Sequence, residues 1–267
     1  MVDELRIVSF GGGVQSTALL VLASRGQIDF QTFVFANVGD DSENPATLVY
    51  VRDVAMPFAR QHGIAIYELH RWRKDGTIET LLMRLYRSKR SMTIPVRMSG
   101  SLGFMRRNCT HDFKILRIEK WCKKHGATAA HPAITAIGIS LDEAHRANSN
   151  HESLFQTKVY PLLDLRLTRD DCAAIIGDAG LPVPPKSSCW FCPYHTNGAW
   201  QAMREQQPEQ FRRAVELEAM LSQRLMLLQG QEAYFHNRKK PLMEATTPGS
   251  SAEDAQVDVC ESGYCML

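Results

Sequence analysis

Short apolar segments alternate with longer segments of helical periodicity along the first part of the chain. Residues 5–10, 30–37 and 64–69 are rich in β-branched and aromatic side chains and predict three strands. Residues 16–25 and 45–62 carry apolar side chains at helical spacing and predict two helices, with Pro57 predicting a kink in the second. Strands that alternate with helices in this way form parallel sheets with crossover helices. The pattern therefore predicts an α/β fold with a parallel, Rossmann-like sheet flanked by helices.

The pattern changes after residue 70. No clear period marks residues 70–108, and a further strand and a loop are predicted at 133–139 and 140–150. Three more helices are predicted over residues 112–125, 167–179 and 199–228. Thr168, followed by Asp171 three residues later, predicts a capping box at the start of the second of these helices. The segment from residue 246 is small, polar and acidic, which predicts a flexible tail.

Composition agrees with one globular chain. With 267 residues and 44% apolar content the chain can bury a sizeable core, and a net charge of +2 excludes a general polycation. No apolar run is long enough to span a membrane and the N-terminus has no signal-peptide features, so we expect a cytoplasmic protein that contacts no membrane. In that setting the seven cysteines are expected to bind metal or do chemistry more often than to form disulfides.

Three consecutive glycines follow the first predicted strand. Residues 9–17 read Ser-Phe-Gly-Gly-Gly-Val-Gln-Ser-Thr, and a helix is predicted to begin at Ser16. A strand, a glycine loop and a helix N-terminus direct main-chain N–H groups toward an anion, although a plain glycine-rich turn is the alternative. The pattern is neither a P-loop, which needs Lys where Gln15 stands, nor the dinucleotide pattern G-x-G-x-x-G. The candidate phosphate-binding residues are Gly11, Gly12, Gly13, Gln15, Ser16 and Thr17.

The second predicted strand ends in a polar turn, Asn37-Val38-Gly39-Asp40-Asp41. Ligands of parallel sheets lie at the carboxyl ends of the strands. We therefore expect this turn to face the glycine loop.

Cysteines form a second constellation. Cys189 and Cys192 have C-x-x-C spacing, which can hold one metal ion or one edge of an iron–sulfur cluster. Cys109 opens a predicted helix, where the helix N-terminus favours a thiolate, and is the best third ligand. His195, Cys260 and Cys265 are candidates for a fourth, with Cys265 placed in the predicted set. An iron–sulfur cluster is favoured over Zn²⁺, with a redox dithiol or plain packing as alternatives. Cys122 and Cys172 lie among apolar residues and are predicted to be core.

Residues 80–111 contain no Asp or Glu but several basic residues. Such a stretch can bind a nucleic-acid backbone, gather around nucleotide phosphates, or form a solvated loop. A nucleic-acid partner is the interpretation that we favour for residues 84–107. The basic residues are Arg84, Arg87, Lys89, Arg90, Arg97, Arg106 and Arg107, with Tyr86 and Phe104 among them.

These motifs together resemble the PP-loop ATP pyrophosphatase superfamily and, within it, the phosphoadenosine phosphosulfate reductase family. Residues 11–16 resemble the loop pattern S-G-G-x-D-S, with Gly11 in place of the serine and Gln15 in place of the aspartate. Residues 37–40 resemble the family's D-T-G turn, and residues 109–114 resemble its C-x-x-x-x-K element. Residues 138–146 resemble its substrate loop, with Ser140 in place of an arginine. The resemblance covers about residues 5–195.

The resemblance implies an adenine nucleotide alpha-hydrolase-like fold that binds ATP, with the glycine loop on the phosphates. It implies that Asn37, Val38 and Gly39 line the adenosine pocket, and that Asp40 or Asp41 binds Mg²⁺ in place of the missing aspartate. Lys114 and Arg146 would neutralise phosphate charge in the transition state. The expected domains are a nucleotide-binding α/β domain (1–165), a helical C-terminal region with the C-x-x-C (166–245) and a flexible tail (246–267).

Three functional hypotheses follow from the resemblance. The first is an ATP pyrophosphatase that adenylates an acceptor for sulfur transfer, with DNA phosphorothioation ahead of tRNA thiolation and a sulfur donor such as a cysteine desulfurase. The second is a sulfonucleotide reductase, in which Cys260 or Cys265 attacks sulfur. The third is a nucleotide-sensing adaptor without catalysis.

Overall fold

The computed structural model describes residues 4–88, 92–101, 104–148 and 153–247. Its centre is a five-stranded sheet in the order β3-β2-β1-β5-β6, and every neighbouring pair is parallel. The predicted α/β fold is thereby confirmed. The strands are β1 (Arg6–Phe10), β2 (Thr32–Ala36), β3 (Ala65–Leu69), β5 (Ala133–Ile137) and β6 (Gln156–Val159).

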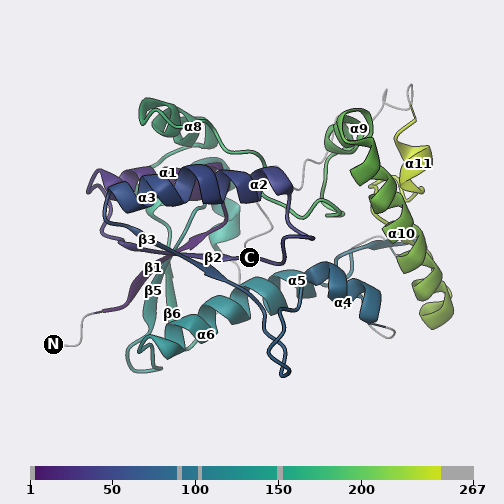
Figure 1. Cartoon of the computed structure of the whole chain (residues 1–267), viewed down its shortest axis with the longest axis horizontal. Helices are drawn as coiled ribbons and strands as arrows, with labels where there is room; N and C mark the ends of the chain where they lie inside the picture. Colours follow the sequence, from purple (N-terminus) through teal and green to yellow (C-terminus); the bar gives the residue numbers. More distant parts are fainter. Residues whose placement is uncertain (1–3, 89–91, 102–103, 149–152, 248–267) are drawn as a thin grey trace.

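Helices cover both faces of this sheet, as Figure 1 shows. On one face, Phe10 and Phe35 pack with α1 and α8, and on the other Val34 and Ala36 pack with α6. Neighbouring residues of β2 thus serve opposite cores, because side chains alternate along a strand. The helices concerned are α1 (Val14–Ser24), α2 (Pro45–Val49), the π-helical η1 (Tyr50–Ala55), α3 (Met56–Gln61), α6 (Leu116–Lys124) and α8 (Arg169–Asp178).

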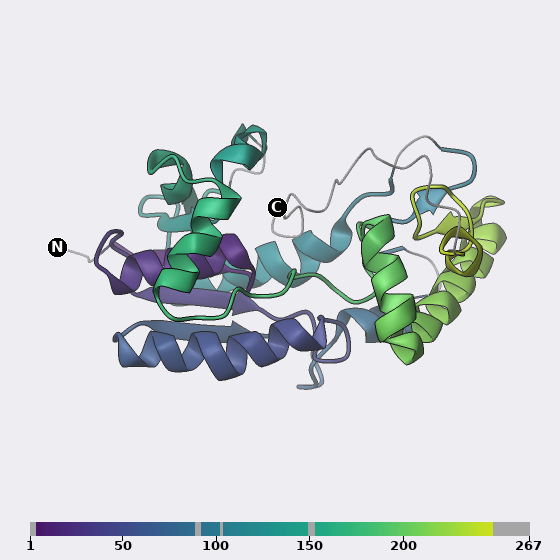
Figure 2. The same cartoon turned by 90° about the horizontal axis from the view of Figure 1, so that it is seen from above.

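A second core lies beside the sheet and is built from two distant parts of the chain. Leu81 and Leu85 of α4 pack with Phe191, Trp200 and Phe235 from the C-terminal part. Figure 2 shows the helices of this part beside the α/β layers. The elements are α4 (Leu81–Arg87), β4 (Arg97–Met98), α9 (Asn197–Gln206), α10 (Pro208–Gln229), β7 (Ala233–Tyr234) and α11 (Leu242–Ala245).

The two cores divide the chain differently from the predicted division at residue 165. Cys172 and Ile176 of α8 are fully buried in the first core, so this core continues past that position. The short elements between the cores are α5 (Asn108–Thr110), the π-helical η2 (His111–Ile115), the 3₁₀ helix η3 (Leu141–Asn148) and α7 (Pro161–Asp164). The predicted flexible tail lies outside the described residues from residue 248 on.

Several local predictions can be compared with the structure. The capping box is confirmed: the main-chain N–H of Asp171 donates to Thr168 Oγ1 (3.2 Å), and that of Thr168 donates to Asp171 Oδ2 (2.8 Å). The predicted single helix over residues 199–228 is wrong, because the chain breaks at Gln207 (φ −136°) before Pro208. A residue before proline is driven out of the helical region, and the ring cannot donate to the preceding turn. The loop predicted over 140–150 contains η3 instead.

The helix around Pro57 contains a π-helical turn, η1, directly before the proline. A π-helical turn interrupts the regular i to i−4 hydrogen bonds of a helix. A proline, which lacks an N–H, destabilises the helix less at such an interruption. Among the described residues, no helix combines the length and apolar character that crossing a membrane requires.

Candidate functional site

The glycine loop joins β1 to α1 and is closed by a serine. Gly12 has φ +71°, and a Cβ there would lie 2.6 Å from Val51 Cγ2, so glycine is required on both counts. The N–H groups of Gly11 and Gly13 both donate to Ser16 Oγ, at 3.3 and 3.2 Å. These amides therefore converge on one point at the N-terminus of α1, where an anion is favoured. Thr17 is fully buried behind them.

Gln15 turns away from the loop toward the end of β5. Its Nε2 donates to Ser140 Oγ (3.4 Å), and its Oε1 accepts from Arg169 Nη1 (3.2 Å). Gly138 makes this approach tight, because a Cβ there would lie 3.1 Å from the main chain of Gln15 and Ser16. The position that lacks a carboxylate thus has a guanidinium beside it. Arg169 could not be recognised as a site residue from the sequence, since only folding brings it to Gln15.

The turn after β2 is held by an ionic network. Arg52 donates to both carboxylate oxygens of Asp40 (2.9 and 2.8 Å) and to Glu68 Oε1 (2.7 Å). Asn37 Nδ2 donates to the same two carboxylates, at 2.7 Å each. The hydrogen bonds from Arg52 lower the pKa of Asp40, although burial opposes them. Both oxygens of Asp40 are therefore committed to Arg52, and its assignment to Mg²⁺ stays a prediction.

Gly39 and Asp41 tie the same turn to α4. Gly39 has φ +124°, and a Cβ there would lie 2.4 Å from Thr80 Cβ. Asp41 Oδ2 accepts from Thr80 Oγ1 at 2.9 Å, and its Oδ1 accepts from Ser42 Oγ at 2.7 Å. The turn is fixed in place by contacts that its sequence does not reveal.

A pocket opens on the α6 side of the sheet, at the carboxyl end of β1. Gly11 of the glycine loop, Ala36 of β2 and Lys114 of η2 all line it. Its lining is mostly apolar, which suits a flat, weakly polar group such as a nucleoside base. The remaining lining residues are Ser9, Phe10, Ile115, Ile118, Thr135, Ile137, Ser153, Gln156 and Lys158.

A second pocket contains three of the predicted metal ligands. Cys109, Cys189 and Cys192 line it together, although 80 residues separate the first from the second. Lys114 lines this pocket as well as the first one, so the two pockets are neighbours. Val38, predicted for the adenosine pocket, lines the cysteine pocket. Cys265 and Cys260 lie outside the described residues.

Local structure explains why these thiols meet. The N–H of Cys192 donates to the carbonyl of Cys189 (3.1 Å), which makes a turn with buried Trp190 and Phe191 between the cysteines. The N–H of Cys109 donates to the carbonyl of Thr93 (2.8 Å) at the start of its helix. Cys122 and Cys172 are fully buried elsewhere, and burial raises the pKa of Cys172 to about 12. Their predicted place in the core is confirmed.

Three thiols in one pocket form a donor set that can hold an iron–sulfur cluster or Zn²⁺, because both take cysteine thiolates as ligands. Among the described residues, no group of three His, Cys, Asp or Glu side chains is close enough to hold one metal ion. Lys114 and Arg107 line the same pocket, and their charges would offset the negative charge of bound thiolates. His195 Nε2 donates to the Cys189 carbonyl (3.0 Å), so that nitrogen is occupied.

One connecting segment ties the cysteine pocket to the glycine loop. The Tyr50 hydroxyl donates to the Pro182 carbonyl (2.8 Å), and Ser187 Oγ donates to the Gly11 carbonyl. The Ser188 carbonyl accepts from the N–H of Asn44 (3.0 Å), just before Cys189 begins the C-x-x-C turn. Residues 182–190, called here the connecting segment, thus lie across the glycine loop and the turn after β2.

Arg146 differs in surroundings from the other predicted cations. Its side chain is 2% exposed and forms an ion pair with Glu143, itself 5% exposed. Burying both charges is tolerable only because they are paired. The structure places Arg146 in an interior ion pair within η3, and its predicted role toward phosphate stays untested.

Within the described residues of the acid-free stretch, several arginines are engaged by other parts of the protein. Arg97 donates to the carbonyls of Pro193 (2.8 Å) and Phe235 (2.6 Å), and Arg107 lies 5.0 Å from the ring centroid of Tyr194. Arg84 pairs with Glu79 and Asp112. Arg87 and Arg106 are exposed, and Lys89 and Arg90 lie outside the described residues.

No family model matches the chain, and no curated protein sequence matches it. Among solved structures, it is similar to the U34-tRNA thiolase NcsA from Methanococcus maripaludis, solved with its [4Fe-4S] cluster. The two chains are 15% identical, with a TM-score of 0.42, and the match covers 82% of this chain and 72% of that one. A likeness at this level assigns no activity to the chain.

Proposed function

We propose that the chain is a PP-loop ATP pyrophosphatase that adenylates an acceptor for sulfur transfer and releases pyrophosphate. One observation carries the proposal: Lys114 lines both the pocket beside the glycine loop and the pocket with three cysteines. The groups that we assign to phosphate binding and to sulfur handling would therefore lie on either side of one residue. That arrangement suits a reaction in which a nucleotide activates a centre that sulfur then attacks.

The nucleotide would bind across the end of β1. The amides of Gly11 and Gly13 and the N-terminus of α1 would hold the phosphates, with Ser16 Oγ marking the point where the amides converge. The pocket on the α6 side would take the adenosine, with Phe10 and Ile137 among its apolar walls. Arg169, beside Gln15, would supply positive charge at the position that lacks a carboxylate for Mg²⁺.

The chemistry consists of two displacements. An acceptor oxygen attacks the α-phosphorus of ATP, a new P–O bond forms, and pyrophosphate leaves with the electron pair of the broken P–O bond. A sulfur nucleophile then attacks the adenylated centre and AMP leaves. Positioning and charge stabilisation account for most catalysis of this kind. Lys114 is 8% exposed at the junction of the pockets, where its ammonium would stabilise charge that develops on the phosphate oxygens.

The cysteine pocket would serve the second displacement. Cys109, Cys189 and Cys192 would hold an iron–sulfur cluster, which when bound can carry or deliver sulfur. The connecting segment would keep this pocket in register with the glycine loop, since Ser187 lies only two residues before Cys189. A cysteine desulfurase would be a suitable sulfur donor.

The acceptor is proposed to be a nucleic acid. Exposed Arg87 and Arg106 within the acid-free stretch support this choice, because phosphate backbones attract such side chains. DNA phosphorothioation ranks ahead of tRNA thiolation. A sulfonucleotide reductase is the second candidate, favoured by Gln15, since a reductase needs no carboxylate for Mg²⁺.

Product analysis tests the proposal. Anaerobically purified protein should release pyrophosphate from ATP, and Lys114→Ala should abolish this release. Lys120→Ala is the matched control, because Lys120 is exposed on the same helical run. Sulfite release from a sulfonucleotide without pyrophosphate release would favour the reductase. Tight ATP binding with neither product would favour a sensing adaptor.

A further inference from the structure

A basic hairpin projects from the molecule between α6 and α4, as Figure 1 shows. Trp72 pairs with Ile78 in an antiparallel bridge, and the N–H of Arg73 donates to the Thr77 carbonyl at 2.8 Å. The tip is closed by Asp75, whose Oδ1 accepts from Thr77 Oγ1 (2.6 Å) and from its N–H (3.1 Å). Gly76 completes the turn with φ +79°. Residues 71–79 are therefore a defined hairpin.

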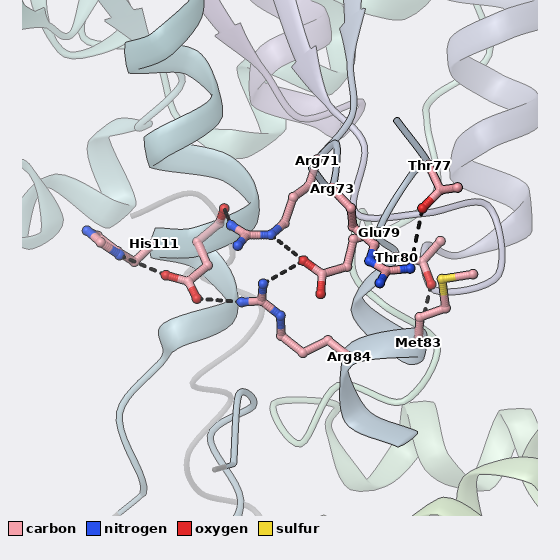
Figure 3. Close-up of polar contacts among 9 residues, drawn as sticks. Arg71, Arg73, Thr77, Glu79, Thr80, Met83, Arg84 and His111 are labelled. Atoms are coloured by element: carbon pink, nitrogen blue, oxygen red, sulfur yellow. Dashed lines mark hydrogen bonds and ion pairs between the residues drawn. The ribbon is translucent and has the colours of Figure 1, made fainter. Parts of the chain in front are cut away.

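The base of the hairpin is anchored to η2, the segment that contains Lys114. Figure 3 shows Glu79 accepting from two arginines, Arg71 Nε (2.5 Å) and Arg84 Nη2 (2.6 Å). Arg84 Nη1 reaches Asp112 Oδ2 (2.7 Å), and Arg71 Nη1 donates to the Asp112 carbonyl (3.2 Å). Both guanidinium groups also lie over the ring of Phe113, at 5.5 and 5.0 Å from its centroid. Phe113 directly precedes Lys114, so the hairpin is held at a fixed distance from the proposed site.

Large aromatic side chains are exposed on the hairpin and on the adjoining helix. Trp72 is 60% exposed, and Tyr86 on α4 is 57% exposed. Arg84 of α4 pairs with Glu79 at the base of the hairpin (2.6 Å), which holds α4 against the hairpin. We call Trp72, Arg73, Lys74, Tyr86 and Arg87 the platform. Exposed aromatic rings offer flat faces on which nucleic-acid bases can stack.

The charge around the platform is positive. Residues 71–87 contain five Lys or Arg and two carboxylates. Asp75 pairs with Arg73 (3.1 Å), Glu79 pairs with Arg71 and Arg84, and Asp112 pairs with Arg84. Five cations against these three carboxylates leave a net charge of +2, with Lys74 and Arg87 outside these pairs. A net positive surface with flat aromatic rings matches a partner that has anionic linkages and unstacked bases.

We propose that the platform binds an unpaired segment of a nucleic acid and presents it to the site at Lys114. Trp72 stacks on a base, while Arg73, Lys74 and Arg87 contact backbone phosphates. This inference rests on the proposed function, which takes the acceptor to be a nucleic acid. It adds that the platform binds this acceptor and that the bound segment is single-stranded. Bases of a duplex are not available for stacking, so paired strands lack the main contact.

Oligonucleotide binding tests the platform. Fluorescence anisotropy at low salt would compare labelled single strands of mixed sequence with their duplexes, each as DNA and as RNA. Trp72→Ala should weaken single-strand binding by roughly 5- to 150-fold, the range that corresponds to one lost base stack. Trp72→Phe should restore much of the affinity, because a phenyl ring still stacks. Lys74→Gln should make the plot of log affinity against log salt concentration less steep by about one unit, the change expected for one lost phosphate contact.

Two variants serve as matched controls. Leu227→Ala removes an apolar side chain that is 83% exposed on α10, and Arg60→Gln removes an exposed charge on α3. Neither should change oligonucleotide affinity. Intrinsic fluorescence gives a second readout: Trp190 and Trp200 are buried and Trp121 is half-buried, whereas Trp72 is exposed and open to quenching by a stacked base, so the quenching should be lost in Trp72→Ala.

The outcomes separate this inference from the proposed function. Equal affinity of Trp72→Ala and the unaltered protein for single strands would refute the platform, as would tighter binding of duplexes or no oligonucleotide binding at all. Pyrophosphate release from ATP is measured independently. If pyrophosphate is released but the platform is refuted, the proposed function holds and the acceptor binds at another surface. If no pyrophosphate is released, the proposed function is refuted.

Discussion

Replacing Gly12 by alanine tests the geometry of the glycine loop most directly. The alanine would have to adopt φ +71°, which costs roughly 1–2 kcal/mol for a residue with a Cβ. The new Cβ would also lie 2.6 Å from Val51 Cγ2 and 3.1 Å from Thr47 Cγ2. Overpacking of this kind costs a further 1–3 kcal/mol or so. We therefore expect Gly12→Ala to lower the free energy of unfolding by about 2–5 kcal/mol.

Gly26→Ala separates the two contributions. Gly26 has nearly the same φ, +68°, but no atom lies within 4 Å of the position of its Cβ. Gly26→Ala should therefore lower the free energy of unfolding only by the cost of the positive φ, about 1–2 kcal/mol. The difference between the variants then measures the contact with Val51, and Val51→Ala should cost less in the Gly12→Ala background than in the unaltered chain.

Denaturant unfolding gives the stabilities, and calorimetric titration gives ATP affinity. Since Gly12 lies between the two amides that converge on Ser16 Oγ, Gly12→Ala should also weaken ATP binding more than Gly26→Ala does. Equal destabilisation by both variants would refute the steric argument. Equal ATP affinity would refute the assignment of the loop amides to the phosphates.

Three further predictions concern other parts of the molecule. Glu218 is 4% exposed and accepts from the N–H groups of Phe235 and Leu242, and its burial raises its pKa to about 7, above the ordinary 4.5. Because the folded protein holds this proton more tightly than the unfolded chain, the free energy of unfolding should fall by on the order of 3 kcal/mol as pH rises from 4.5 through about 7. Glu218→Gln cannot titrate and should make the free energy of unfolding less dependent on pH over this range. Cys189→Ser should lose bound iron and the visible absorbance of the cluster. The control Cys172→Ser, which lies in the other core, should keep both. Iron retained in Cys189→Ser would contradict the proposed ligand set. Gln15→Asp should lower the Mg²⁺ concentration needed for ATP turnover, since carboxylates are preferred Mg²⁺ ligands, while Gln15→Asn should not; an unchanged Mg²⁺ requirement would argue against this position as a metal site.

The sheet and its helices could be predicted because their signals are local. Apolar periodicity located β1, β2, β3 and β5, and the glycines located the loop after β1. The strand β6 was missed because Gln156–Val159 is short and mostly polar at the edge of the sheet. The break between α9 and α10 was also missed, although Pro208 is visible in the sequence, because the helical spacing of apolar residues continues past it.

The candidate site was harder to predict because its contacts join distant residues. The motif Cys189-x-x-Cys192 indicated metal chemistry, but only the fold brings Cys109 into the same pocket. The pairing of Arg52 with Asp40 links a helix to a turn, and no short pattern encodes it. Arg146 lies in a predicted substrate loop, yet folding buries it against Glu143. Motifs therefore identified which residue types matter, whereas burial and ion pairing decided how each can act.

The connecting segment has a consequence for how the protein would respond to oxidative stress. Ser187 holds the carbonyl of Gly11, and Cys189 follows two residues later on the same stretch of main chain. Oxidation of Cys189 would disturb this stretch of main chain and, with it, the contact of Ser187 with the glycine loop. If the glycine loop binds ATP as proposed, oxidised protein would lose nucleotide affinity together with its thiols.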